Sequence, residues 1–183
     1  MPIYDRIGAG YTKHRCADPR IVDQIVNAMG LAPPAVIADI GAGTGNYSRA
    51  LADLVYQIEA VEPSEAMRRQ AILHDGVRWH DGTAEHIPLP DNSVDGIICV
   101  LSVHHFSSLP SAIGELARIC PAGPIVWFTF DHAKAKTPWL HDYFPALWEG
   151  TCKVFPPLEN ICRLLETGTH RRVEVIPYCI PHD

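Results

Sequence analysis

The segment from Ile37 to Ser48 constrains the fold more than any other part of this 183-residue chain. It begins with an apolar run that ends in an acid, continues through the glycine-rich segment 41–45, and leads into a helix-forming stretch. Glycine accepts positive φ angles and lets a ligand approach the backbone closely. The first N–H groups of a following helix point back toward that ligand. The pattern therefore predicts a buried strand, a ligand-binding turn and a helix.

The spacing of these glycines distinguishes between two classes of ligand. A dinucleotide-binding turn has the pattern G-x-G-x-x-G, with the pyrophosphate at the helix N-terminus. Here the glycines stand at alternate positions, 41, 43 and 45, and Asp39 precedes the first of them by two residues. A carboxylate at that place would repel a phosphate but suits a ligand with an ammonium or sulfonium group. A nicotinamide-dependent oxidoreductase is therefore a weak alternative.

Two further segments follow in the order expected of alternating strands and helices. A second apolar stretch ends in Glu62, about twenty residues after the glycines, where an acid can accept hydrogen bonds from ribose hydroxyls. A solvent-facing carboxylate is the alternative interpretation. A polar loop with several prolines covers residues 80–95, and the apolar stretch after it, up to Val103, predicts a strand buried on both faces.

Together these segments, over roughly residues 1–131, resemble the class I S-adenosylmethionine-dependent methyltransferases. The order of the motifs is similar to that of the methyltransferase type 11 group, which includes proteins of ubiquinone and menaquinone biosynthesis. The resemblance implies S-adenosylmethionine as cofactor, S-adenosylhomocysteine as its product, and a small molecule as methyl acceptor. It also implies an α/β fold, a Rossmann-like, doubly wound and mostly parallel sheet with helices on both faces.

The resemblance also implies roles for individual residues. Gly41, Ala42 and Gly43 would pass under the methionine part and the sugar of the cofactor, Asp39 would hold its amino group, and Glu62 would bind the ribose hydroxyls. Further predicted contacts are Ser64 and Met67 beside the adenine, Thr83 and Ala84 at its edge, and Leu101 and Ser102 from the fourth strand. Relatives usually have aspartate where this chain has Thr83, which is a weaker neutral acceptor, so we expect weaker binding.

Residues near the N-terminus and after the fourth strand complete the predicted site. In similar proteins the leading segment folds over the cofactor, so Tyr11 would cover the sulfonium and Arg15 would pair with a carboxylate; a frayed terminus is the alternative.

Methyl transfer from a sulfonium depends mainly on positioning, but a base assists a hydroxyl or an acidic carbon. We select His104 as the candidate base, since His105 would point to the opposite face of a strand. A packing role is the alternative, and Ser102 is a weaker candidate.

The chain is expected to form a single methyltransferase domain. It divides into an N-terminal cap and helix (1–35), a cofactor-binding core (36–131) and a lid or substrate region with a final strand (132–183). The expected strands are 36–40, 58–62, 77–80, 95–103, 125–131 and 173–180. One expected helix begins at Asp18-Pro19, and the others cover 46–54, 64–73, 110–120 and 158–167. Aromatic residues at helical spacing in 139–148 predict a helix that either packs on the sheet or lines the acceptor site.

The family's usual sheet has seven strands, and the sequence offers no candidate for the last of them. We therefore expect a C-terminally truncated sheet with an open edge beside strand 125–131. Such an edge exposes unpaired backbone groups and favours pairing with another chain, including a homodimer. A cofactor-binding protein or fragment with impaired catalysis is the alternative function.

Composition excludes several classes of partner. A net charge of −6 argues against a nucleic-acid partner and an anionic membrane surface. The sequence contains no apolar run of about eighteen residues that would span a membrane, and its N-terminus has no signal-peptide pattern. The six cysteines are scattered without a C-x-x-C pair, so we expect no metal site. Free thiols in a reducing compartment predict a cytoplasmic location.

Overall fold

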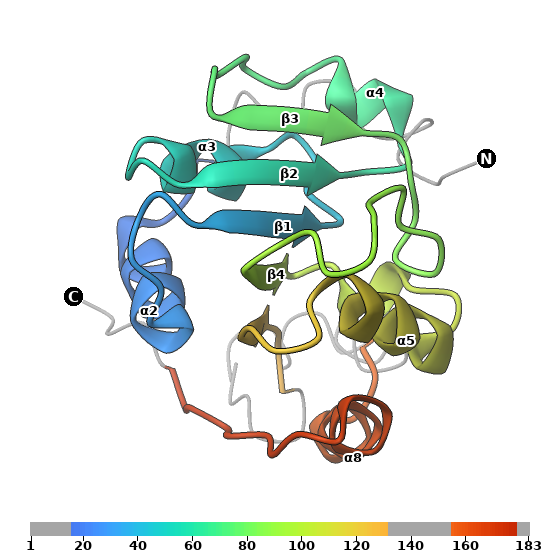
Figure 1. Cartoon of the computed structure of the whole chain (residues 1–183). Helices are drawn as coiled ribbons and strands as arrows, with labels where there is room; N and C mark the ends of the chain where they lie inside the picture. Colours follow the sequence, from blue (N-terminus) through green and yellow to red (C-terminus); the bar gives the residue numbers. More distant parts are fainter. Residues whose placement is uncertain (1–15, 132–154, 179–183) are drawn as a thin grey trace, which may run out of the picture.

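The computed structural model describes residues 16–131 and 155–178 (Figure 1). Within these ranges one parallel sheet has the strand order β3-β2-β1-β4-β5. Its strands are β1 (Val36–Ile40), β2 (Gln57–Val61), β3 (Val77–His80), β4 (Gly96–Val100) and β5 (Ile125–Phe128). The described helices are α2 (Pro19–Met29), α3 (Asn46–Ala52), α4 (Glu65–Arg68), the 3-10 helix η2 (Val103–His105), α5 (Leu109–Ile119) and α8 (Leu158–Thr169).

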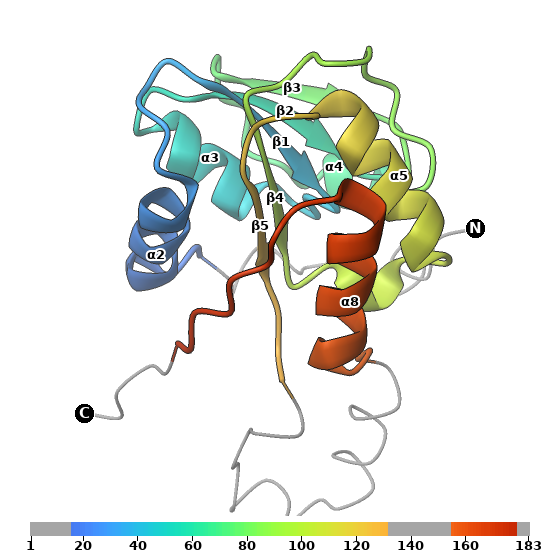
Figure 2. The ribbon, with the colours of Figure 1, turned by 60° about the horizontal axis from the view of Figure 1, so that its bottom comes forward.

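Helices cover both faces of the sheet, as Figure 2 shows. On one face α2 and α3 pack through Ile25 and Leu51 against Ile37 of β1. On the other face α5 packs through Leu116 against Ile97 of β4. Helix α8 lies beside α5 on this face (Figure 2), and residues of both helices share a smaller apolar cluster (Ile113, Ile161 and Leu165). The predicted α/β fold with a doubly wound parallel sheet is therefore confirmed.

All the strand pairs are parallel, so the carboxyl ends of the strands lie at one edge of the sheet. β1 is the central strand, with Ile37 paired to Ile58 of β2 on one side and to Gly96 of β4 on the other. Ligands of such sheets bind beyond the carboxyl ends, where neighbouring connections diverge. The glycine-rich segment follows β1 at this edge.

Helix α2 confirms the local signals read from the sequence. The carboxylate of Asp18 accepts a hydrogen bond from the Arg20 N–H at 2.9 Å, and Pro19 occupies the first turn. Gly30 ends the helix in the left-handed conformation with φ of 60°. A proline at the start and a glycine just past the end are the expected helix boundaries.

Helix α4 is much shorter than the predicted helix 64–73. The Ser64 hydroxyl accepts a hydrogen bond from the Met67 N–H at 3.3 Å and begins the helix, but the helix ends at Arg68. Ile72 and Leu73 remain 56% and 86% exposed. The prediction was wrong at this end because these apolar side chains have no core face to cover, and packing supplies most of a helix's stability.

The predicted strand 173–180 is wrong over the part that the structure describes, because residues 173–178 form no strand. Val175 and Ile176 are about half exposed, and the Tyr178 ring lies 5.8 Å from that of Phe128 in β5. Apolar alternation predicts an extended conformation, but a strand also needs a hydrogen-bonded neighbour in register. Residues 179–180 and the predicted helix 139–148 lie outside the described residues.

Other boundaries differ from prediction by a few residues. β4 and β5 end before residues 103 and 131. Helix α8 continues through Gly168 to Thr169, and the capping residue after it, His170, has φ of 56°. Across the described residues, no helix has the length and apolar character required to cross a bilayer.

Candidate functional site

The turn after β1 is tied to the end of β2. The N–H groups of Gly41 and Ala42 both donate to the Val61 carbonyl, at 2.9 and 3.1 Å. Gly41, Gly43 and Gly45 have φ of 74°, 59° and 75°. These left-handed angles cost little for glycine and substantially more for residues with a β-carbon. The sequence pattern is thus explained by the backbone path that leads into α3.

Ser102 closes the turn from the side of β4. Its hydroxyl donates to the Ile40 carbonyl at 2.8 Å, and a β-carbon built on Gly41 would lie 2.6 Å from the Ser102 β-carbon. Leu101, just before it, has φ of 51° and donates its N–H to the Phe128 carbonyl. The structure therefore brings Ser102 to the glycine turn, while the Leu101 side chain is 40% exposed.

Replacing Gly41 with alanine should destabilise the fold by about 3 kcal/mol, because backbone strain and overpacking each cost roughly 1–2 kcal/mol or more. Gly30→Ala is the matched control. Gly30 also has a positive φ, but a β-carbon there would meet no atom within 4 Å. Urea unfolding of both variants would separate the cost of the contact from that of the angle. Equal losses would contradict the close approach of Ser102.

The Glu62 carboxylate lies just past β2 and is held by backbone on two sides. Its Oε2 accepts from the Gly43 N–H at 2.8 Å and its Oε1 from the Ser64 N–H at 2.9 Å. The methyl carbon of Met67 lies 3.5 Å from the place where a β-carbon on Gly43 would stand. Two predicted cofactor residues, Gly43 and Ser64, therefore bind the Glu62 carboxylate, and a third, Met67, lies beside Gly43.

Asp39 lies beside this group and is fully enclosed, with 2% of its surface exposed. The Ser48 hydroxyl donates to its Oδ2 at 2.5 Å. Burial raises the pKa of the Asp39 carboxyl to about 7; the Ser48 hydrogen bond opposes this rise, and the negative charge of Glu62 adds to it. Because burial penalises the ionised carboxyl, a cation placed beside it would be bound favourably.

Thr83 and Ala84 lie on the loop that leaves β3. The Glu62 N–H donates to the His80 carbonyl at 3.1 Å, so this loop begins beside the Glu62 carboxylate. Ala84 is buried in the core, whereas Thr83 is exposed and forms an isolated bridge with His86. Tyr11 and Arg15 lie outside the described residues.

His104 is not at the end of a strand, which corrects the argument used to select it. β4 ends at Val100, and the left-handed Leu101 turns the chain into η2. The rings of His104 and His105 lie 3.8 Å apart, rather than on opposite faces. The Phe155 ring is 4.2 Å from that of His104. Nδ1 of His104 is buried without a hydrogen-bond partner, and burial, with a smaller contribution from His105, lowers its pKa to about 4.

Sequence analysis missed three residues of this edge. Ser48 binds Asp39 from the first turn of α3, a position that strand–turn–helix geometry could have indicated. The Arg68 guanidinium donates to the Glu62 carbonyl and pairs with Asp81 at 2.9 Å. Trp79 of β3 lies against Gly45. These last two contacts have no local sequence signal, because they join residues brought together only by the fold.

Comparison with known proteins identifies the family. A family model described as a methyltransferase domain matches residues 38–128. One similar solved structure is a putative methyltransferase from an antibiotic biosynthesis pathway of Anabaena variabilis, with 51% sequence identity and a TM-score of 0.88. The match covers 92% of this chain and 68% of the Anabaena chain. A putative S-adenosylmethionine-dependent methyltransferase of Methanococcus maripaludis is 26% identical, with coverages of 81% and 74% and a TM-score of 0.64. The chain belongs to the S-adenosylmethionine-dependent methyltransferases.

Curated members of this methyltransferase family include malonyl-[acyl-carrier protein] O-methyltransferases. That of Pectobacterium atrosepticum is 36% identical over 93 residues, which are 50% of this chain and 37% of that protein. Among the first curated relatives, the chain spans only 35% to 61% of their length. In the part of this methyltransferase that the structure describes, no three His, Cys, Asp or Glu residues form a group able to hold a metal ion.

Proposed function

We propose that this methyltransferase binds S-adenosylmethionine over the glycine turn and transfers its methyl group to a small-molecule acceptor. The observation that carries the proposal is the pair of carboxyl groups, Asp39 and Glu62, beside a turn of left-handed glycines. A ligand that is cationic at one end and carries a ribose fits this pair, whereas a pyrophosphate does not.

The roles of the individual residues follow the family. Asp39 would hold the amino group and Glu62 the ribose hydroxyls, and Gly43 has no β-carbon that would approach Met67. The remaining assignments are Gly41 and Ala42 under the methionine part, Ser64 and Met67 beside the adenine, Thr83 and Ala84 at its edge, Leu101 and Ser102 from the end of β4, Tyr11 over the sulfonium, and Arg15 paired with a carboxylate. When bound, S-adenosylmethionine supplies an electrophilic methyl group.

His104 is the residue proposed to act on the acceptor. Its ring lies in an aromatic cluster with Phe155 and, 5.9 Å from Phe155, Phe130. A pKa of about 4 keeps its imidazole neutral at physiological pH, so one of its ring nitrogens can accept a hydrogen bond from an acceptor hydroxyl. Because the His104 imidazole is a weak base, it would orient the acceptor hydroxyl rather than keep its proton. The proton released on methyl transfer would pass to water. The Anabaena relative, from an antibiotic biosynthesis pathway, supports a small-molecule acceptor.

Calorimetry with S-adenosylmethionine and S-adenosylhomocysteine tests the proposal. Wild type should bind both in about the micromolar range, and Gly43→Trp should not bind, because the indole would fill the proposed site. Gly114→Trp is the matched control, since a β-carbon on this exposed glycine of α5 meets nothing within 4 Å. Loss of binding in both variants, or no binding by folded wild type, would contradict the site.

Methyl transfer separates the enzyme from the impaired cofactor-binding protein. Incubation with methyl-labelled S-adenosylmethionine and a panel of hydroxylated small molecules should give a labelled product. His104→Asn should lower the rate and leave S-adenosylhomocysteine affinity unchanged. Tight cofactor binding without transfer to any acceptor would favour the alternative.

We also propose a homodimer formed through β5, an edge strand of the described sheet, and sedimentation would measure the association. The lack of a nucleic-acid partner, which follows from the net charge of −6, and a cytoplasmic location are further proposals.

A further inference from the structure

The connection from β3 to β4 has an unusual construction for a parallel sheet. Parallel strands of one sheet are usually joined through a helix, but residues 81–95 contain none. Buried backbone groups still need partners, and here α5 supplies several of them. The N–H groups of Asn92 and Ser93 donate to the carbonyls of Arg118 and Ile119, at 2.9 Å each. The shape of this loop therefore depends on a helix that follows it in the sequence.

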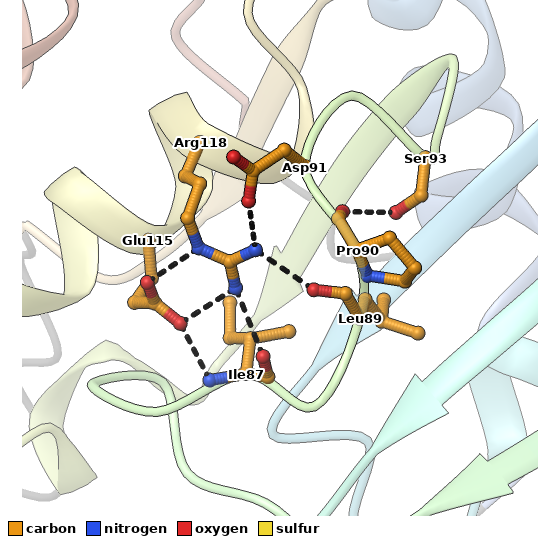
Figure 3. A network of polar contacts seen from close by, with 7 residues as sticks. All are labelled: Ile87, Leu89, Pro90, Asp91, Ser93, Glu115 and Arg118. Carbon is orange, nitrogen blue, oxygen red and sulfur yellow. Dashed lines mark hydrogen bonds and ion pairs between the residues drawn. The ribbon is translucent and has the colours of Figure 1, made fainter.

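Arg118 of α5 makes the densest set of these contacts (Figure 3). Its Nε and Nη2 donate to the two carboxylate oxygens of Glu115, at 2.7 and 2.8 Å. Its Nη groups donate to the carbonyls of Ile87 and Leu89, at 2.9 and 2.8 Å, and to the Asp91 carboxylate at 2.8 Å. Glu115 in turn accepts from the Ile87 N–H at 2.8 Å. All five N–H donors of the guanidinium are used, three by the loop and two by Glu115, the acid that also holds the loop at Ile87.

The beginning of the same loop is fixed to the start of α5. Oε1 of Glu85 accepts from the N–H groups of Ser107 and Ser108, at 2.5 and 3.1 Å. Ala84 and Ile87 are buried in the cluster that includes Leu116 of α5. Thr83, the residue before this anchored segment, therefore has its position set by the way in which the loop is attached to the helix.

We propose that Arg118 is a positioning residue for recognition of the cofactor's adenine, acting through the loop that carries Thr83 and Ala84. The inference rests on the proposed function, in which these two residues meet the edge of the base. Arg118 itself would touch no cofactor atom. It holds the carbonyls of Ile87 and Leu89 with a planar fork of donors, which lysine, with three donors on a flexible stem, cannot reproduce.

The test compares S-adenosylhomocysteine with S-inosylhomocysteine, in which an oxygen replaces the adenine amino group. Arg118→Gln should weaken S-adenosylhomocysteine binding about tenfold, the equivalent of roughly one lost hydrogen bond. Binding of the inosine analogue should fall much less, so the wild-type preference for adenine should shrink. Arg118→Lys should restore part of the preference. Calorimetry on the folded variants gives both affinities.

Arg171→Gln is the matched control. Arg171 also donates to two backbone carbonyls, those of Cys120 and Gly123, but these follow α5 in the sequence and do not belong to the loop 81–95. This variant should keep the adenine preference of the wild type. Should Arg118→Gln fail to fold, Glu115→Gln gives the same comparison, since it disturbs the guanidinium contacts while preserving side-chain size.

The outcomes separate this inference from the proposed function. No binding of S-adenosylhomocysteine by folded wild type overturns both. Binding by wild type with an unchanged preference in Arg118→Gln, or with equal weakening of the two ligands, overturns the positioning role alone. A lower melting temperature without any change in preference would assign Arg118 to folding only.

Discussion

Glu62→Ala should weaken binding of S-adenosylhomocysteine by at least about a hundredfold. The proposed ribose contacts are two hydrogen bonds to a charged group, each worth about 1.5–3 kcal/mol, and 1.4 kcal/mol is a factor of ten in affinity. The variant also removes the acceptor of the Gly43 and Ser64 N–H groups, so the turn loses a support on the β2 side. Isothermal titration calorimetry would measure the change.

Glu59→Ala is the control for this prediction. Glu59 lies on β2, three residues before Glu62, and its carboxylate also makes two contacts, with Arg78 at 2.6 Å and with His80 at 2.5 Å, but it does not bind the glycine turn. Its loss should leave cofactor affinity within about threefold of wild type, since these contacts lie outside the proposed site. Near-wild-type binding by Glu62→Ala would refute the ribose assignment, and equal losses in both variants would point to general damage to β2.

Asp39→Asn should be more stable than wild type, and the difference in free energy of unfolding should grow as the pH rises. The pKa of Asp39 is raised from 3.8 to about 7 in the folded state. A raised carboxyl pKa contributes stability that is present below pH 3.8 and is lost as the pH rises through about 7. Asparagine mimics the neutral carboxyl and avoids that loss. Its advantage should therefore grow by about 3 kcal/mol between roughly pH 5 and pH 8, as urea unfolding would measure.

Asp23→Asn, at an exposed position of α2, should show no such growth. A constant difference between Asp39→Asn and wild type across this pH range would mean that the buried carboxyl ionises normally.

Asp39→Asn should also bind S-adenosylhomocysteine about tenfold less tightly, because the proposed partner of the amino group loses its charge. Higher stability with lower affinity is the expected trade-off at a binding site.

The features predictable from sequence are those with a local physical cause. Asp18 and Gly30 mark the ends of α2 because capping depends on neighbouring backbone groups. The glycines predicted the turn because a positive φ strongly favours that residue. The predicted strand that includes Val175 failed for the opposite reason, since pairing depends on a distant neighbour. The contacts of Arg118 with the loop could not be predicted either, because the loop residues that it binds lie about thirty positions earlier in the chain (Figure 3).

The structure brings the predicted site residues together unequally. The Glu62 carboxylate accepts a hydrogen bond from the Ser64 N–H beside the glycine turn, a contact that the sequence had not indicated. The environment of His104 could not be read from the sequence, because the turn at Leu101 depends on the end of β4 and its neighbour β5. Its imidazole is neutral because of burial, and one of the two rings beside it, that of Phe155, comes from a distant segment.

The attachment of Glu85 to Ser107 and Ser108 has a thermodynamic consequence. It joins the loop proposed to meet the adenine with the backbone just past the His104 turn. Any ligand that orders the first of these segments also restrains the second. Cofactor and acceptor should then bind cooperatively, each raising the affinity of the other by the same factor, because such coupling is reciprocal. Calorimetry of acceptor binding with and without S-adenosylhomocysteine would measure that factor.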